Sequence, residues 1–405
     1  MKKRLIGNLI YGQSGGPTSV INSSAYGLFT EAKKHKDRIN KIYAMHYGIE
    51  GLLKEDIIDI DDYSDKELKN LLTTPGSAFG SNRYKLGNDV EDKDKFDKII
   101  EIFKKYNIRF FFYNGGNDSM ETIKKILDYA KKVNYDMCGI GIPKTIDNDL
   151  PYLDHTPGYG SAAKFIANVV SQIYFDDNSY INGRVNIIEI MGRNAGWLTA
   201  SSSLATLNGA IIDLIYVPET PFNIEDFLKK VEKIYQNKRR CLVCVSEGIK
   251  DKDGNFISAF SNDYDAFGHN QLGGVGMFLS SLVTKRLNLR SRYIELSLLQ
   301  RTNTCFPSDV DVKEARKVAS YALKVALRGS TNKIVTIKRV SDEPYKIKLG
   351  LLNIALVANK EKYLPLTYLN IEHDNILPSF IKYALPLIGN DSKKEENGLY
   401  KSFKL

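Results

Sequence analysis

Runs of apolar residues, rich in β-branched and aromatic side chains, recur along the chain and alternate with stretches whose apolar positions follow helical spacing. The pattern predicts strands at residues 5–11, 41–47, 109–113, 137–142, 185–191, 211–217 and 241–245. It predicts helices at about residues 18–34, 120–132, 160–172, 195–205 and 224–236. Strands that alternate with helices in this way are typical of parallel sheets covered by helices, so we expect an α/β fold.

The length and composition of the chain predict a globular protein of more than one lobe. The chain has 405 residues, which is more than one compact core usually holds. Hydrophobic residues make up 43% and charged residues 26%, as in ordinary globular proteins. No run of 18 apolar residues is present, so we expect no membrane span. The basic Met1–Arg4 leads into the first predicted strand rather than into a signal peptide.

Four cysteines are present, and this low number favours a reducing compartment, the cytoplasm. Cys241 and Cys244 form a C-x-x-C pair inside a predicted strand. Such pairs occur in redox and metal sites, but no second C-x-x-C accompanies this one and the five histidines are scattered. We therefore interpret both thiols as buried residues of the strand.

The chain is basic, with a net charge of +9 and an isoelectric point near 9.0. A basic protein can bind nucleic acid or an anionic metabolite. The lysines are spread along the chain, and no basic run has interleaved aromatic residues. We therefore expect no nucleic-acid partner, and small phosphorylated ligands stay possible if particular arginines bind them.

Two glycine-rich turns follow predicted strands, at the edge where parallel sheets bind ligands. They are G-Q-S-G-G-P-T at 12–18 and G-G-N-D-S at 115–119. Glycines let backbone N–H groups approach a phosphate closely, and the start of the following helix favours negative charge. A plain strand-to-helix turn would also use glycine, and Asp118 or Ser119 would then serve only as a helix cap.

A third polar turn, P-K-T-I-D-N-D at 143–149, carries a lysine, a hydroxyl and two carboxylates. A carboxylate near a lysine can accept a proton from a substrate hydroxyl, while the lysine neutralises the charge of a phosphoryl group. The alternative is a turn held by Asx hydrogen bonds. The density of reactive groups favours a catalytic site.

These three turns, together with M-G-R at 191–193, occur in an order that resembles the phosphofructokinase family. Further matches are G-S-A-F-G-S-N-R at 76–83, S-E-G at 246–248 and Q-R at 300–301, so the resemblance spans about residues 5–310. It implies a two-lobed fold with a donor-binding lobe at 1–150 and a sugar-phosphate-binding lobe at 151–300. The first lobe is expected to take a later segment from about 301 onward. Residues 333–405 are expected to form a C-terminal extension whose role the sequence does not indicate.

The resemblance also implies the site residues. The catalytic group would comprise Asp147, Lys144, Asp118 and Arg193, with Asp147 as the base that takes the proton of the sugar C1 hydroxyl. The sugar phosphate would be bound by Thr145, Ile146, Asp147, Arg184, Met191, Gly192, Arg193, Glu247, Arg292, Leu298, Gln300 and Arg301. The donor would be bound by Gly15, Gly16, Arg83, Gly116, Asp118 and Lys144, and the metal ion, expected to be Mg²⁺, by Asn117 and Asp149.

Two positions depart from the family pattern. Asn117 stands where the family usually has an aspartate near the metal, and a neutral amide contributes less to cation binding, so Asp118 is expected to supply the charge. Leu298 stands where histidine or tyrosine is frequent, so one phosphate contact is absent or is made by Tyr293.

The position of Asp118 is typically glycine in ATP-using relatives, whereas a carboxylate there fills space and repels the α-phosphate of ATP. Together with Lys144 it predicts pyrophosphate as the donor. The expected reaction converts fructose 6-phosphate into fructose 1,6-bisphosphate and phosphate, a reversible step of glycolysis. The alternatives are an ATP-dependent enzyme of the same fold and, from another class, a non-catalytic regulatory subunit or sugar-phosphate-binding protein. A homo-oligomer, dimer or tetramer, is expected because this family shares arginines such as Arg184 and Arg292 between subunits.

Overall fold

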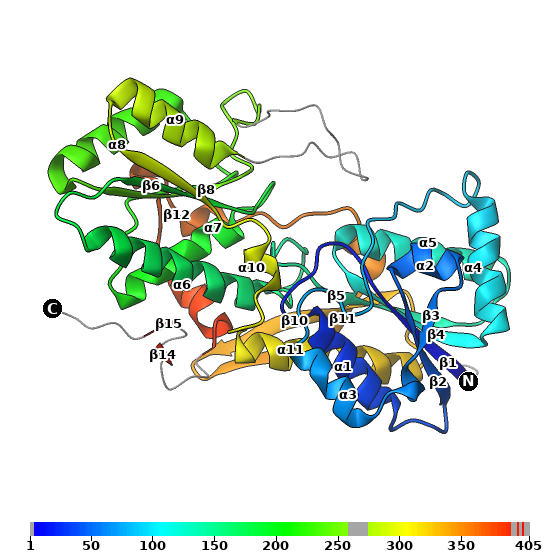
Figure 1. Cartoon of the computed structure of the whole chain (residues 1–405). Coiled ribbons are helices and arrows are strands. Elements are labelled where there is room, and N and C mark those ends of the chain that lie inside the picture. Colours follow the sequence, from blue (N-terminus) through cyan, green and yellow to red (C-terminus); the bar gives the residue numbers. More distant parts are fainter. Residues whose placement is uncertain (1–3, 258–273, 390–394, 397–398, 401–405) are drawn as a thin grey trace. The chain divides into compact units, whose positions relative to one another are not determined.

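The structure, a computed structural model, describes residues 4–257, 274–389, 395–396 and 399–400 (Figure 1). The chain divides into two compact units, each assembled from several segments. The first unit takes in residues 1–146, 150–158 and 311–362, and the second takes in residues 147–149, 159–310 and 363–405. No helix in the described ranges combines the length and the apolar composition that crossing a membrane requires.

The first unit is built on a seven-stranded sheet with the order β11-β10-β5-β4-β1-β2-β3. Its strands are β1 (Gly7–Gln13), β2 (Ile39–Met45), β3 (Ile57–Asp59), β4 (Ile108–Gly115), β5 (Cys138–Pro143), β10 (Lys333–Asp342) and β11 (Tyr345–Asn353). Only the two edge strands, β3 and β11, pair antiparallel. Because β1, β4 and β5 are parallel neighbours, the turns that follow them meet at one edge of the sheet.

Helices cover both faces of this sheet because successive strand residues point to opposite sides. Tyr11 and Phe112 pack in one core with α1 (Ile21–Ala32) and α11 (Asp309–Leu327). Ile10 and Phe111 pack in the other core. The helices of that second core are α2 (Gly48–Leu53), α4 (Lys93–Lys105) and α5 (Asn117–Lys132), and the short α3 (Asp65–Lys69) lies outside it.

A buried ionic cluster joins the loop 150–158 to α11 and to the β10–β11 hairpin. The ring of His155 lies between two carboxylates, with Nδ1 2.7 Å from Asp154 Oδ1 and Nε2 2.6 Å from Glu314 Oε2. Arg339 donates to Asp154, and the Tyr345 hydroxyl donates to Glu314. Burial by itself lowers the pKa of His155, but the hydrogen bonds to the two carboxylates outweigh burial and raise it to about 9.

This cluster predicts that the first unit loses stability at alkaline pH. The pKa of His155 is raised on folding, so its contribution is fully present below about pH 6.5 and is lost as the pH rises through about 9. The contribution is on the order of a few kcal/mol. Thermal unfolding of wild type and of His155→Gln at pH 6.5 and pH 10 checks this. We expect wild type to be clearly more stable than His155→Gln at pH 6.5, and this difference in stability to shrink at pH 10. An equal difference at both pH values contradicts the prediction.

The second unit is built on a parallel four-stranded sheet with the order β7-β8-β6-β9. Its strands are β6 (Val185–Ile190), β7 (Leu214–Tyr216), β8 (Cys241–Ser246) and β9 (Ser291–Glu295). The helices α8 (Ile224–Lys238) and α9 (Val275–Leu287) share a core with one face of this sheet. The remaining helices before residue 303 are α6 (Tyr159–Asn178), α7 (Trp197–Ser201) and α10 (Leu299–Thr302), and α7 contacts β7 and β8.

The two cysteines of the C-x-x-C pair are buried on β8, as we predicted. Residues three apart on a strand point to opposite faces, and Cys241 belongs to the core under α8 and α9, whereas Cys244 does not. Burial raises the pKa of the Cys244 thiol to about 12. The two thiols therefore lie on opposite faces of the sheet, and Cys244 stays protonated. A metal or redox site requires thiols on one side and in the thiolate form.

The C-terminal stretch lies differently from the extension we predicted. Residues 333–353 complete the first unit's sheet as β10 and β11, and the later segment of that unit begins at Asp311 rather than near 301. Residues 363–389 belong to the second unit, where they form β12 (Leu369–Asn370), β13 (Asn375–Ile376) and α12 (Pro378–Ala384). Two short strands, β14 (Glu395–Glu396) and β15 (Leu399–Tyr400), follow. The boundary shifts because β10 continues the sheet beside β5, while Gln300 packs in the second unit.

Candidate active site

In the first unit, the turn after β1 is held in one conformation by its neighbours. Gly15 has a left-handed φ of 76°, which favours glycine. Its N–H donates to Asn82 O at 3.1 Å, and the Ser81 hydroxyl donates to its carbonyl at 2.6 Å. Arg83, exposed to solvent, follows directly. The structure thus brings the segment that carries Arg83 beside the glycine turn.

Lys144 places a cation at this turn. Its side chain is almost fully buried, with 3% exposed, and Nζ donates to Gly16 O at 2.6 Å. A Cβ on Gly15 would lie 3.3 Å from Nζ, and a Cβ on Gly116 would lie 3.8 Å from the Lys144 carbonyl. Gly15, Gly16, Gly116 and Lys144, all predicted to bind the donor, are therefore neighbours.

The turn after β4 leads directly into α5, which begins at Asn117. A Cβ on Gly115 would lie 2.0 Å from Ser119 Oγ, and that hydroxyl donates to Ser14 Oγ at 2.9 Å, which joins the two turns. Asp118 lies in the first turn of α5, where the helix dipole favours a carboxylate. The residue before the helix, Gly116, has no side chain that could cap it, and Asp118 and Ser119 are the second and third residues of the helix.

The segment after β5 passes from the first unit into the second. Thr145 is held by its N–H, which donates to Pro157 O at 3.3 Å, and Ile146 is buried. Asp147 and Asp149 belong to the second unit and flank Asn148, which has a left-handed φ of 56° and no exposed surface. Asparagine tolerates this conformation better than most residues.

The predicted sugar loop after β6 is clamped on several sides. Met191 N–H donates to Gln300 Oε1 at 3.3 Å, and Gly192 N–H donates to Glu247 Oε1 at 3.2 Å. The Ser246 hydroxyl donates to the Gly192 carbonyl. A Cβ on Gly248 would lie 1.8 Å from Arg193 O, so S-E-G can approach the loop only with glycine at this position.

Glu247 lies in this environment as a buried carboxyl group. Burial raises its pKa to about 7, the Gly192 N–H opposes this, and the charge of Asp147 raises it further. Arg193 acts in the opposite direction, so Asp147, Arg193 and Glu247 are close enough to influence one another. The second unit therefore gathers the predicted base with the predicted sugar-binding residues.

Two predicted phosphate ligands lie elsewhere in the unit. Arg184 precedes Val185, the first residue of β6. Arg292 lies on β9, where it pairs with Asn186, the second residue of β6. Met191 follows the other end of β6, roughly 20 Å along the strand at about 3.3 Å per residue. Within one chain, the structure does not bring Arg184 or Arg292 to the sugar loop.

The third arginine is better placed. Arg301 lies in α10 beside Gln300, which contacts Met191. Leu298 is 55% exposed and its side chain cannot donate to a phosphate. Tyr293 pairs with Ile187 in the middle of β6, away from α10, so nothing here places it as a substitute.

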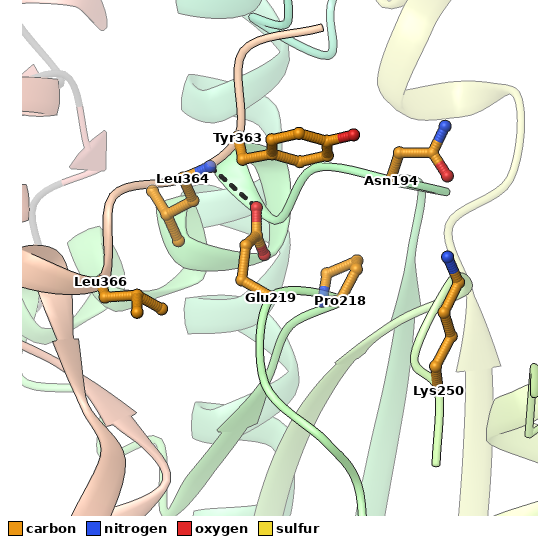
Figure 2. Close-up of a pocket in the computed structure, with 7 residues that line it drawn as sticks. All are labelled: Asn194, Pro218, Glu219, Lys250, Tyr363, Leu364 and Leu366. Atoms are coloured by element: carbon orange, nitrogen blue, oxygen red, sulfur yellow. Dashed lines mark hydrogen bonds between the residues drawn. The ribbon is translucent and has the colours of Figure 1, made fainter. Parts of the chain in front are cut away.

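A pocket of about 360 Å³ lies in the second unit next to the sugar loop (Figure 2). It is lined by Asn194, Pro218, Glu219, Lys250, Tyr363, Leu364 and Leu366. Glu219 Oε1 accepts the N–H of Gly196 at 2.9 Å and that of Leu364 at 2.8 Å. Burial raises the pKa of Glu219, and these N–H groups oppose the rise. Glu219 thus links the sugar loop to the C-terminal segment.

The oxygen atoms of the Asn117 and Asp118 side chains are of the kind that Mg²⁺ binds, and they fit an ion that substrate phosphates hold for the most part. Among the described residues, no group of three or more His, Cys, Asp or Glu forms a metal cage. Mg²⁺ needs none, because it keeps several waters and binds one or two carboxylates with substrate phosphates. Asn117 Oδ1 already accepts the Asp118 N–H at 2.9 Å. Within this turn of the first unit, the Asp118 carboxylate is therefore a better candidate than the Asn117 amide.

Several residues that shape the site were not predicted. Ser81 and Asn82 hold Gly15, Glu219 holds Gly196, and Asn148 bonds Tyr383. Ser81, Asn82 and Asn148 lie inside motifs that the sequence analysis recognised, so the signal was present there. Glu219 and Tyr383 lie far from any motif in the sequence.

The profile of the family described as Phosphofructokinase matches residues 8–326. The chain belongs to the phosphofructokinase family. A protein of Halomonas elongata described as pyrophosphate--fructose 6-phosphate 1-phosphotransferase is 40% identical over 402 residues, which cover 98% of this chain and 96% of that protein.

Two solved structures are similar over nearly the whole chain. They are pyrophosphate-dependent phosphofructokinases of Marinobacter aquaeolei (36% identity, TM-score 0.85) and Nitrosospira multiformis (35% identity, TM-score 0.86). Each match covers 98% of this chain, and 95% and 94% of those chains respectively. The similarity confirms the predicted fold class and family.

Proposed function

We propose that the protein transfers a phosphoryl group from pyrophosphate to the C1 hydroxyl of fructose 6-phosphate, giving fructose 1,6-bisphosphate and phosphate. The observation that carries the proposal is that Asp147 and Arg193 both act on the charge of the buried Glu247, and that Asp147 follows Lys144, which bonds the glycine turn, by three residues. The relatives named above as pyrophosphate-dependent phosphotransferases support this donor over ATP. The low number of cysteines, four in the whole chain, suits a reaction in the cytoplasm.

The proposed mechanism assigns the two substrates to two groups of residues. Gly15, whose N–H is bonded to Asn82 O, shapes the turn, while Gly16 and Gly116 present backbone N–H groups to the donor phosphates. Lys144 stabilises the charge of the transferring group. Glu247 and the loop 191–193 hold the sugar. Asp147 accepts the C1 hydroxyl proton as the oxygen attacks phosphorus and the bond to the leaving phosphate breaks.

An assay of the purified protein with fructose 6-phosphate and Mg²⁺, supplied with either pyrophosphate or ATP, tests the proposal. Fructose 1,6-bisphosphate is measured in a coupled assay, in which aldolase cleaves it and a linked enzyme reduces the cleavage product. Product formed with pyrophosphate alone supports it. Product formed only with ATP favours the ATP-dependent alternative, and no product with either donor favours a non-catalytic sugar-phosphate-binding protein.

We propose Asp118 and Asp149 as the side chains that hold Mg²⁺ with the donor. The ion neutralises negative charge on the donor oxygens. Activity is expected to disappear with a chelator and to return with added Mg²⁺. In Asp149→Asn we expect the Mg²⁺ concentration for half-maximal activity to rise about tenfold or more, since one carboxylate charge is lost. An unchanged Mg²⁺ dependence in this variant argues against the assignment.

We also propose a homo-oligomer with shared sites, because Arg184 and Arg292 lie far along β6 and β9 from the sugar loop of their own chain. In this arrangement they bind the 6-phosphate of a neighbouring subunit, with charge-assisted bonds. Arg184→Ala and Asp147→Ala proteins are each expected to be nearly inactive. After subunit exchange, a mixture should regain part of the activity, since some hybrids contain one intact site. No recovery in hybrids whose exchange has been verified contradicts shared sites.

A further inference from the structure

The C-terminal segment 363–389 contributes an aromatic cluster to the second unit. The rings of Tyr368, Phe380 and Tyr383 pack on one another with centroids 5.6 to 6.0 Å apart. Trp197, the first residue of α7, joins them, with its ring 5.4 Å from that of Tyr383. The cluster therefore connects the C-terminal segment to the helix that follows the sugar loop.

Tyr383 also contacts the turn that carries the proposed base. Asn148 Nδ2 donates to the Tyr383 hydroxyl at 2.9 Å. Asn148 is fully buried, lies between Asp147 and Asp149, and has a left-handed φ of 56°. A buried side-chain bond at such a residue restricts the backbone on both sides, because the strained conformation persists only where its surroundings fix it.

A second contact of the same segment reaches the sugar loop. Glu219 accepts the N–H groups of Leu364 and Gly196, and a Cβ on Gly196 would lie 2.7 Å from Glu219 Oε2. Gly196 is three residues beyond Arg193. The C-terminal segment is thus bonded to the catalytic turn at one point and, through Glu219, to the sugar loop at another.

We propose that the C-terminal segment 363–389 is a positioning element of the active site. Tyr383 fixes the turn that carries Asp147, and Glu219 fixes the loop that carries Arg193. The inference rests on the proposed function, and it gives the C-terminal part of the chain a role in turnover. In this proposal both residues act through the backbone of their partners rather than on the reacting atoms.

Tyr383→Phe tests the first contact because it removes one hydroxyl and keeps the ring in the cluster. We expect kcat to fall about tenfold, since displacement of a reacting group by a fraction of an ångström has effects of this order. The KM for fructose 6-phosphate should change less than twofold. Tyr368→Phe, which removes a hydroxyl from the same cluster, is the matched control and should keep a kcat close to that of wild type.

Asn148→Gly provides the second arm, because glycine accepts the φ of 56° while removing the amide. If both side chains act through their shared bond, the fall in kcat of the double variant Asn148→Gly/Tyr383→Phe should be no greater than that of the more affected single variant. Multiplied effects, or a Tyr383→Phe kcat within twofold of wild type, overturn the proposal. Glu219→Leu tests the second contact, because leucine accepts neither the Gly196 N–H nor the Leu364 N–H. We expect the KM for fructose 6-phosphate to rise about fivefold or more in this variant, and an unchanged KM contradicts the role of Glu219.

Hydrogen–deuterium exchange of the peptide covering residues 145–150 gives a readout that needs no turnover. Faster exchange in Tyr383→Phe than in Tyr368→Phe supports the positioning role, and equal exchange contradicts it. Wild type assayed in the same series separates the two hypotheses. Inactive wild type with faster exchange in Tyr383→Phe contradicts only the proposed function, whereas active wild type with unchanged Tyr383→Phe contradicts only this inference.

Discussion

Asp147→Ala is expected to lower kcat by about 10²- to 10⁴-fold, the range typical for loss of a general base. The C1 hydroxyl is a poor nucleophile until its proton is removed, and Asp147 is the proposed acceptor. It lies close enough to Glu247 and Arg193 for their charges to interact. Steady-state kinetics with pyrophosphate and saturating fructose 6-phosphate measure the loss, which should appear in kcat much more than in sugar-phosphate affinity.

Asp147→Asn is the matched control for shape, because it keeps the volume of the side chain and loses its basicity. Both variants should bind fructose 6-phosphate with an affinity within a few-fold of wild type in calorimetric titration. If the asparagine variant lost as much turnover as the alanine variant, basicity rather than packing would explain the loss. A folded Asp147→Ala protein with near-normal turnover would remove the mechanism.

The donor preference should be equally large. The wild-type protein is expected to use pyrophosphate and to show little or no turnover with ATP. Asp118 lies in the first turn of α5, two residues beyond Gly116. Like charges about 4 Å apart repel by roughly 4 kcal/mol at an effective dielectric of 20, which corresponds to about a thousandfold discrimination. We propose that the carboxylate rejects the α-phosphate of ATP in this way.

Asp118→Gly is expected to weaken the use of pyrophosphate and to allow measurable turnover with ATP, with Lys144→Gly added if the single change is not enough. Asp118→Asn separates charge from volume, because it is neutral but nearly the same size. ATP turnover in Asp118→Asn comparable to that in Asp118→Gly would identify charge as the barrier, and turnover in the glycine variant alone would identify space. Robust ATP turnover and none with pyrophosphate in wild type would overturn the donor assignment.

Much of the fold was predictable because its strands are buried on both faces and alternate with amphipathic helices. The runs at 109–113 and 137–142 correspond to β4 and β5, and the turns after them carry the predicted motifs. The stretch 211–217 yields only the short strand Leu214–Tyr216. Apolar composition overstated this strand because the residues before it pair with no neighbouring strand among the described residues, and Ile211 is 50% exposed.

The contacts that hold the site were less predictable, because they join residues far apart in the sequence. Tyr383 meets Asn148 across 235 positions, and Leu364 meets Glu219 across 145. No local pattern encodes such pairs, since each depends on how the chain returns to the second unit. The separation of Arg184 from Met191 follows from the length of β6, which the sequence predicted. The expectation that Arg184 binds at a neighbouring subunit came instead from the resemblance to the family.

The sheet of the first unit has a consequence for the order in which the chain folds during synthesis. β10 pairs with β5, although nearly two hundred residues separate them. Until the ribosome has passed residue 342, β5 is therefore an edge strand without its neighbour. The four strands of the second unit's main sheet lie between residues 185 and 295 and can pair earlier. Until β10 arrives, the buried, apolar β5 is an unprotected edge, which is the kind of surface that chaperones bind and that aggregates recruit. A chain that stalls or is cut before that point exposes this edge permanently.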